Sequence, residues 1–240
     1  MIDDNLCVIV PARGGSKGIP GKNIKFLGQE PLVNWAIKIA FDIQSVNPSN
    51  VYLSTDCSKI MEIGKKCGAK VIERPSSLAQ DKSTVISMID HHLDLFKAMG
   101  KTYELIIYLE PTSPFRTTKE ITECVNTLRR NNLDSVATFA KLGFDVNSLL
   151  KQKKNGSILR YTNLNTVSSP ITPYVLSGAV YVFDVNSYMT QRPTGIYFGN
   201  RGHVIQTSPH VDIDEPFDLE KAQSLLHSLH GTYWDSLKLL

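Results

Sequence analysis

A stretch near the start of the chain has residue types suited to holding phosphate. It reads P-A-R-G-G-S-K-G-I-P-G-K-N and runs from Pro11 to Asn23. Glycines let a backbone approach a phosphate closely, and Arg13, Lys17 and Lys22 would neutralise its charge. Because the stretch follows an apolar run that is typical of a buried strand, we interpret it as a phosphate-binding loop. A mobile surface turn is the alternative.

This loop does not match two common nucleotide-binding patterns. In the P-loop pattern G-x-x-x-x-G-K-[ST], Ser16 stands where the first glycine belongs, and Asn23 replaces the hydroxyl residue that holds magnesium. The dinucleotide pattern G-x-G-x-x-G is also absent from the loop. If the loop binds phosphate, it does so through a different arrangement.

A second candidate stretch, V-D-I-D-E-P-F-D-L, runs from Val211 to Leu219. Asp212 and Asp214 alternate on an expected strand, so both carboxylates face one side while the apolar residues face the core. Two carboxylates beside substrate phosphates are a common magnesium arrangement. The alternative is an exposed strand edge, with Asp214 or Glu215 capping the helix that follows.

The elements that position these stretches alternate between strand and helix. Apolar runs predict strands at Leu6–Val10, Val51–Leu53, Val71–Ile72, Leu105–Leu109, Ala179–Phe183 and Val211–Ile213. Apolar residues at helical spacing predict helices at Leu32–Ile43, Ile60–Cys67, Val85–Met99, Glu120–Arg130 and Pro216–Leu229. This alternation predicts an α/β fold with a largely parallel sheet and helices on both faces. Ligands bind such sheets at the carboxyl ends of the strands, that is, in the loops after Val10, Leu53, Val71 and Leu109.

Length and composition indicate one globular domain. The chain has 240 residues, a net charge of +3, 42% hydrophobic residues and 20% charged residues. Such a composition excludes a disordered chain, and the charge is too small to indicate nucleic acid or membrane binding. No apolar run approaches the roughly 18 residues of a membrane span, and the start, M-I-D-D-N, is acidic where a signal peptide is basic. We therefore expect a cytoplasmic protein.

Within the single domain, residues 143–174 are expected to form an inserted subdomain, because the regular alternation fades there while apolar residues persist. The four cysteines lack metal-ligand spacing and are expected to be buried thiols. Trp35 is expected in the core. His91 and His92 are adjacent on a helix and point about 100° apart, so we expect them to be surface or partly packed residues.

Taken together, the motifs resemble a known family. In order, they are A-R-G-G-S-K-G-I-P-G-K-N, S-T-D at Ser54–Asp56, E-R-P-S-S-L-A-Q-D at Glu73–Asp81, L-E-P-T-S-P-F-R at Leu109–Arg116, G-A-V-Y-V at Gly178–Val182 and D-I-D-E-P-F-D-L. This ordered set is similar to that of the acylneuraminate cytidylyltransferases, the CMP-sialic acid synthetases and their relatives for other nine-carbon sugar acids. The resemblance implies a Rossmann-like, three-layer nucleotide-diphospho-sugar transferase fold. It also implies a homodimer that pairs through the inserted subdomain.

The resemblance further implies an activity and roles for single residues. Members of this family join CTP to the anomeric hydroxyl of a 2-keto sugar acid and release pyrophosphate, with Mg²⁺ as cofactor. By this analogy Lys22, Arg13 and Asp214 are catalytic, and Asp212 and Asp214 hold the metal. The residues expected to bind the nucleotide are Arg13, Gly14, Lys17, Lys22, Asn23, Arg74, Asp81, Ser83 and Thr84. Those expected to bind the sugar acid are Glu110, Thr112, Ser113 and Tyr181. For Arg74 and Asp81 a structural salt bridge is the alternative.

Two departures from the family pattern concern the sugar end. Glu110 stands where the family has glutamine, and a carboxylate cannot donate a hydrogen bond unless it is protonated. The segment Asn165–Pro170 stands where the family has an arginine-rich stretch, and Ser177 replaces an asparagine. Arg160, Lys141 or Lys151 could supply the missing charge. Two alternatives therefore stay open, a nucleotidyltransferase of the same fold acting on a different sugar or phosphorylated nucleophile, and a non-catalytic binding module.

Overall fold

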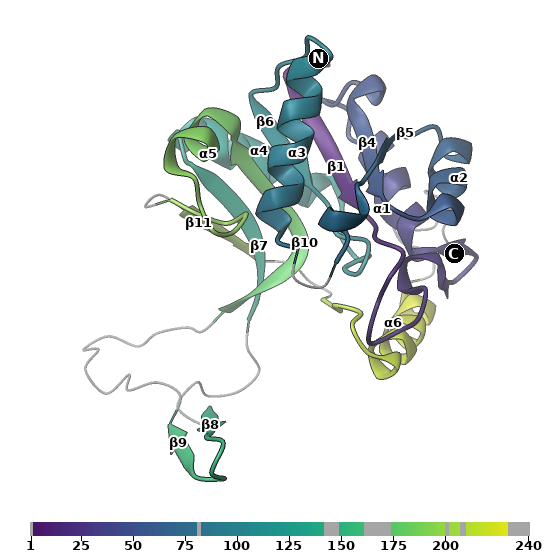
Figure 1. The fold of residues 1–240 in the computed structure, drawn as a ribbon, viewed down its shortest axis with the longest axis vertical. Helices are drawn as coiled ribbons and strands as arrows, with labels where there is room; N and C mark the ends of the chain where they lie inside the picture. The colour runs from purple at the N-terminus through teal and green to yellow at the C-terminus, as the bar shows by residue number, and fades with distance from the viewer. Residues whose placement is uncertain are drawn as a thin grey trace.

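Seven of the described strands form the central sheet of the protein. The computed structural model describes residues 2–80, 83–141, 149–160, 174–199, 202–206 and 210–229. The strand order is β11-β7-β10-β6-β1-β4-β5 (Figure 1). The bounds are β1 Leu6–Pro11, β4 Val51–Thr55, β5 Lys70–Glu73, β6 Leu105–Tyr108, β7 Ser135–Lys141, β10 Tyr174–Asp184 and β11 Gly202–Gln206. Short antiparallel pairs are formed by β2 Phe26–Leu27 with β3 Glu30–Pro31, and by β8 Leu150–Gln152 with β9 Ile158–Arg160.

The sheet is mainly parallel, as predicted. The strand β1 pairs in parallel with β4 and with β6, β4 with β5, and β11 with β7. The exception is β10, which runs antiparallel to both of its neighbours, β6 and β7. The strands β7 and β11 and the helix α5 were not predicted.

Helices cover both faces of the sheet, which gives the three layers expected. One face carries α1 Leu32–Phe41, α2 Ser58–Lys66 and α4 Thr118–Asn131, and the other carries α3 Val85–Ala98 and α5 Val185–Gln191 (Figure 1). The side chains of β1 alternate between these layers: Leu6 and Val8 pack with the first group, and Cys7 and Ile9 with the second. Every residue from Leu6 to Val10 is fully buried, which explains the continuous apolar run.

A third cluster of buried side chains joins distant parts of the chain. Helix α6, Pro216–Ser228, packs against the end of the glycine-rich loop and the start of α1, through Ile19, Trp35, Phe115 and Ile213 among others. Trp35 is 1% exposed, which confirms its expected place in the core. This packing brings the Asp212–Asp214 stretch to the first loop.

Two expectations about local structure were wrong. The segment Val211–Ile213 is not a strand. Ile213 is fully buried, as its pattern predicted. Its N–H donates to the Thr112 carbonyl (2.8 Å) and not to a neighbouring strand of a sheet. His92 is fully buried on α3, where we expected a surface or partly packed residue, because that helix face lies against the sheet. Its Nδ1 lies 2.5 Å from the Met88 carbonyl oxygen of the preceding turn.

The expected subdomain at 143–174 lies between β7 and β10. In this interval the structure describes residues 149–160, which contain the β8–β9 pair, and Tyr174 at the start of β10. The segment Asn165–Pro170 lies outside the described residues. All four cysteines are free thiols; Cys7 and Cys124 are buried, and Cys57 and Cys67 are half-buried. Among the described helices, none has the length and apolar character needed to cross a membrane.

Candidate active site

A cavity of about 250 Å³ lies where the order of the strands reverses. From β1 the chain proceeds to β4 and β5 on one side and then returns to β6 on the other side of β1. The loops that leave β1, β5 and β6 meet at this point, which is the expected ligand site of such a sheet. The cavity is lined by Pro11, Arg13, Gly15, Ser16, Lys22, Asn23, Arg74, Tyr108, Glu110, Pro111, Thr112 and Asp214.

The glycine-rich loop is held against two other motifs. The Gly14 N–H donates to Asp56 Oδ1 at 2.8 Å, which ties the loop to the end of β4. A Cβ added to Gly18 would lie 2.1 Å from the Asp214 carbonyl oxygen, so only glycine permits this approach. These contacts fix the loop in place beside the cavity.

Lys22 and Asp214 form an ion pair at the cavity. Lys22 Nζ lies 2.8 Å from Asp214 Oδ1, and the side chains are 12% and 71% exposed, respectively. Next to Lys22, the Asn23 amide donates from Nδ2 to the Arg13 carbonyl at 2.9 Å. Asn23 Oδ1 is buried and has no hydrogen-bond partner among the described residues. A buried acceptor without a hydrogen bond destabilises the fold, so this atom is suited to accept a hydrogen bond from a bound molecule.

Arg74 reaches the cavity from the end of β5. It is 7% exposed, and it donates from Nε to Ser54 Oγ (3.2 Å) and from Nη2 to the Ser54 carbonyl (3.1 Å). Burial lowers the pKa of Arg74, while Tyr108 and Asp56 raise it. Ser54 and Asp56 therefore hold the arginine and the glycine-rich loop in place. Asp81, the possible partner of Arg74, lies outside the described residues.

Four of the residues expected to bind nucleotide do not line the described cavity: Gly14, Lys17, Ser83 and Thr84. Lys17 is exposed on the loop. The Ser83 hydroxyl donates to the Ser77 carbonyl at 2.8 Å. The Thr84 hydroxyl caps α3 by accepting from the Ser87 N–H at 3.1 Å.

Glu110 and Thr112 line the cavity, whereas Ser113 and Tyr181 lie deeper. Burial and repulsion from Asp212 raise the pKa of Glu110 to about 7, against an opposing effect of the buried Arg116 guanidinium. Tyr181 is 7% exposed and packs edge-on against Tyr108, with ring centroids 6.0 Å apart. Burial and then Glu110 raise the pKa of the Tyr181 hydroxyl, so it stays protonated and can donate.

Ser113 is only 2% exposed. Its hydroxyl faces the Ser177 carbonyl oxygen at 2.9 Å and Asp212 Oδ1 at 3.3 Å. Sequence reasoning gave no role to Tyr108, which lines the cavity, or to Arg116. Tyr108 could have been found as the last residue of β6, because the carboxyl end of a strand borders the ligand site.

Asp214 lines the cavity, whereas Asp212 is not among the lining residues and bonds to the Ser113 hydroxyl. Repulsion from both contributes to the raised pKa of Glu110, so the negative charge gathered here suits a cation. Within the described ranges, no cluster of three or more histidine, cysteine or acidic residues could hold a metal. The residues therefore fit Mg²⁺ only if ligand oxygens complete its shell, which is how Mg²⁺ usually binds with phosphates. The alternative capping role belongs to Glu215, the N-cap of α6, whose N–H donates to Asp218 Oδ2 at 2.9 Å.

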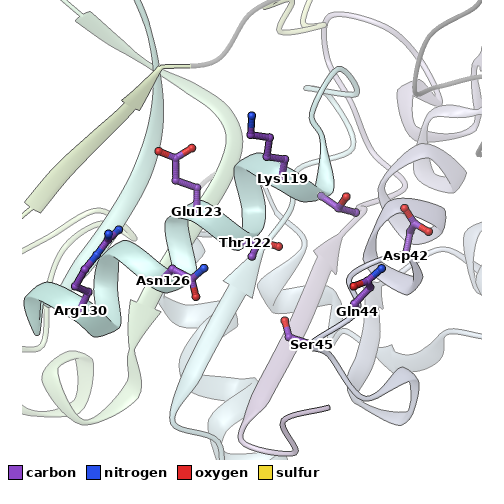
Figure 2. A pocket seen from close by; sticks show the side chains of 9 residues that line it. Asp42, Gln44, Ser45, Lys119, Thr122, Glu123, Asn126 and Arg130 are labelled. Atoms are coloured by element: carbon purple, nitrogen blue, oxygen red, sulfur yellow. The ribbon is translucent and has the colours of Figure 1, made fainter. Parts of the chain in front are cut away.

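A second hollow, of about 850 Å³, lies between α4 and the segment after α1. Figure 2 shows its polar lining, which includes Lys119, Glu123 and Arg130 from α4 and Asp42, Gln44 and Ser45 from the other side. It contains none of the residues expected to act on a substrate. Size alone therefore does not identify the site, and the smaller cavity is the one where the motifs meet.

Comparisons with known proteins agree with this location. Residues 7–238 match a protein family described as cytidylyltransferase. An N-acylneuraminate cytidylyltransferase A from Danio rerio is 36% identical over 132 residues, which is 55% of this chain and 29% of that protein. A CMP-N,N'-diacetyllegionaminic acid synthase from Legionella pneumophila is 27% identical over 230 residues, covering 92% of this chain and 96% of that protein.

Solved structures share the fold. The structure of CMP:2-keto-3-deoxy-manno-octonic acid synthetase in complex with CTP superposes with a TM-score of 0.65 at 15% identity, covering 93% of this chain and 98% of that chain. The chain spans less than a third of the zebrafish protein but nearly all of the Legionella one. Since the family match extends over almost the whole sequence and the expected fold is present, the chain belongs to the cytidylyltransferase family.

Proposed function

We propose that this protein transfers CMP from CTP to the anomeric hydroxyl of a nonulosonic, sialic-acid-like sugar acid and releases pyrophosphate. The observation that carries the proposal is the cavity at the strand reversal, which is lined by Arg13, Lys22 and Arg74 together with Asp214. Three cations suit the negative charge of a triphosphate. The cytidylyltransferase family supports transfer of a cytidylyl group as the reaction. The names of the Danio and Legionella relatives support a nine-carbon sugar acid as the acceptor.

The chain's own residues would act mainly by placing the nucleotide. In-line displacement at phosphorus depends on position and charge neutralisation more than on covalent chemistry. Lys22 and Arg13 would hold phosphate oxygens, and the unsatisfied Asn23 Oδ1 would accept a hydrogen bond from the nucleotide. Arg74 is pre-positioned by Ser54, so it loses little freedom on binding.

We propose that Asp212 and Asp214 hold Mg²⁺ together with phosphate oxygens. A bound Mg²⁺ would supply neutralisation of the phosphate charge and a lower pKa for the attacking hydroxyl. Lys22 pairs with Asp214 at 2.8 Å, so the cation proposed to bind phosphate lies beside a carboxylate proposed to bind Mg²⁺. On binding, Lys22 would exchange this carboxylate for a phosphate oxygen.

The sugar acid would lie toward Glu110 and Thr112, which line the cavity, with the Tyr181 hydroxyl behind them. Its carboxylate needs a cation. Lys141 and Lys151 are exposed and could supply one, and the side chain of Arg160 lies outside the described part of the chain. We propose a cytoplasmic location, because an enzyme that uses CTP needs the compartment in which CTP is made.

We also propose a homodimer that forms through the β8–β9 pair and the start of β10. Large apolar side chains are 39–59% exposed in both places: Leu150, Ile158 and Leu159 on the β8–β9 pair, and Tyr174, Val175 and Leu176 at the start of β10. Exposed apolar side chains of this size favour contact with a partner. Sedimentation should find a dimer at micromolar concentration and a monomer for Ile158→Glu. A monomeric wild-type protein would refute the proposal.

The test of the activity is pyrophosphate release with CTP, Mg²⁺ and a panel of acceptors. The panel contains N-acetylneuraminic, legionaminic, pseudaminic and eight-carbon ulosonic acids and a sugar 1-phosphate, with UTP as the control donor. We expect release with CTP and one nine-carbon acid. Release only with a sugar 1-phosphate would replace the proposal by the other nucleotidyltransferase chemistry, and CTP binding without any release would indicate a binding module.

A further inference from the structure

The turn that leaves β6, Glu110–Arg116, is built around one buried arginine. The Arg116 side chain is fully buried, and burial lowers the pKa of Arg116 to about 10, so it is still charged at neutral pH. Its Nε donates to the Ser113 carbonyl at 2.9 Å, and its Nη2 donates to the carbonyls of Glu110 and Ser113. A single rigid guanidinium is thus bonded to the start of the turn, at Glu110, and to its middle, at Ser113.

The Glu110–Arg116 turn is also hydrogen-bonded to the segment that carries Asp212 and Asp214. The Ile213 N–H donates to the Thr112 carbonyl at 2.8 Å. The Ser113 hydroxyl shares its single proton between the Ser177 carbonyl oxygen at 2.9 Å and Asp212 Oδ1 at 3.3 Å. Among the hydrogen bonds of the described residues, this is the one that reaches the Asp212 carboxylate.

The contacts around Gly178 show how closely these groups converge. Gly178 has a φ of +71°, and a Cβ there would lie 2.7 Å from Ser113 Oγ, 3.0 Å from Glu110 Oε2 and 3.7 Å from Asp212 Oδ2. The side chains therefore occupy the space that a larger residue would fill. Because an ionised Glu110 repels Asp212, a group that holds the Asp212 carboxylate in place is useful here.

We propose that Ser113 is a positioning residue, which orients the Asp212 carboxylate for the divalent cation and is itself fixed by Arg116. The inference rests on the proposed function, because it takes Asp212 as a metal ligand. Ser113 is 2% exposed, and its hydroxyl is engaged with the Ser177 carbonyl oxygen and with Asp212 Oδ1, so it is suited to hold a neighbouring group in place. Groups that orient a metal ligand typically change metal affinity about 10- to 100-fold when they are removed.

The test measures binding of Mn²⁺, by its electron paramagnetic resonance signal, to protein saturated with CTP and without acceptor. We expect Ser113→Ala to raise the dissociation constant for Mn²⁺ about 10-fold or more. The matched control is Ser135→Ala. Ser135 is also fully buried and bonds to backbone, its hydroxyl donating to the Phe198 carbonyl at 2.6 Å, but it lies on β7 away from the cavity. This control should lower the melting temperature as much as Ser113→Ala does, with unchanged Mn²⁺ affinity.

Asp212→Asn separates the two ways in which the inference could be wrong. If Asp212→Asn weakens Mn²⁺ binding and Ser113→Ala binds as tightly as wild type, Ser113 does not position the ligand and the metal site stands. If wild type and Asp212→Asn bind Mn²⁺ alike, Asp212 is not a ligand and the proposed metal site is overturned as well. Equal weakening by Ser113→Ala and Ser135→Ala would show a loss of stability only and would also refute the inference.

Discussion

Replacing Lys22 by alanine separates the phosphate-binding role of this residue from its contribution to stability. The Lys22–Asp214 pair is 2.8 Å long, but the Asp214 side chain is 71% exposed. Ion pairs with an exposed partner contribute at most about 1 kcal/mol, because water and salt screen them. For a chain of this size, that loss would lower the melting temperature by about 2–4 °C.

The expected effect on catalysis is much larger. Lys22 is 12% exposed and lines a cavity with two arginines, so its ammonium is held where phosphate charge would develop. Removal of one such preorganised group typically lowers the rate about 100- to 1,000-fold, or roughly 3–4 kcal/mol. We therefore expect Lys22→Ala to lower kcat/KM for CTP by at least 100-fold in a pyrophosphate-release assay, while the melting temperature falls by no more than about 2–4 °C.

Lys38→Ala provides the matched control. Lys38 Nζ lies 2.7 Å from Glu30 Oε1, in a pair whose partner is less exposed than Asp214, and Lys38 does not line the cavity. Its removal should affect stability at least as much as Lys22→Ala while leaving kcat/KM near that of wild type. A Lys22→Ala enzyme within threefold of wild type would refute the phosphate-binding role of the loop. So would equal losses of activity in the two variants.

Three further outcomes are expected from other residues. Asp214→Asn should abolish Mg²⁺-dependent pyrophosphate release, and full retention would remove this residue from the metal site. Gly18→Ala should raise the KM for CTP, because its Cβ would lie 2.1 Å from the Asp214 carbonyl oxygen. Gly195→Ala is the control, because its Cβ would lie no closer than 4.0 Å to any neighbour. Equal changes of KM in the two variants would contradict the argument. The pKa of Glu110 is about 7 in the folded protein, against an ordinary value of 4.5, so the native state binds this proton more tightly than the unfolded chain. In metal-free protein the contribution of Glu110 to the free energy of unfolding should therefore fall as pH rises from about 4.5 to 7. Over this range the free energy of unfolding of Glu110→Gln should rise more steeply, or fall less, than that of wild type, and identical pH dependences in urea melts would show that Glu110 does not contribute.

The elements with a strong pattern could be predicted from the sequence. The apolar run Leu6–Val10 predicted β1 because all of its residues are buried between two layers of helices. The periodic stretch Leu32–Ile43 predicted α1, which ends at Phe41, two residues earlier. Burial determines these patterns directly, so the sequence alone is enough to recognise them.

The direction of β10 could not be predicted in the same way. Its apolar residues indicate a strand, but nothing in them specifies antiparallel pairing with β6 and β7. The same limit explains the wrong strand at Val211–Ile213. Alternation there reflects the burial of Ile213, whereas a strand also needs a ladder partner, and its N–H bonds to a turn instead.

Within the site, charged residues were easier to predict than the groups that hold them. Arg13, Lys22, Arg74 and Asp214 all line the cavity, as their motifs indicated. The bonds from Arg116 to two carbonyls depend on the path of the backbone, which has no sequence signature that we could use. Such supporting bonds become visible only in the folded structure.

Ser177 and Glu110, two single residues that depart from the family's pattern, lie at different depths. Ser177 is fully buried, and its hydroxyl lies 2.7 Å from the Thr138 hydroxyl, so it affects a substrate only through its neighbours. Glu110 lines the cavity itself. An ionised carboxyl group accepts hydrogen bonds and cannot donate them, whereas glutamine does both. Since the pKa of Glu110 is about 7, its protonated form can donate as glutamine does, while its ionised form favours a sugar acid that places a hydroxyl or another donor there.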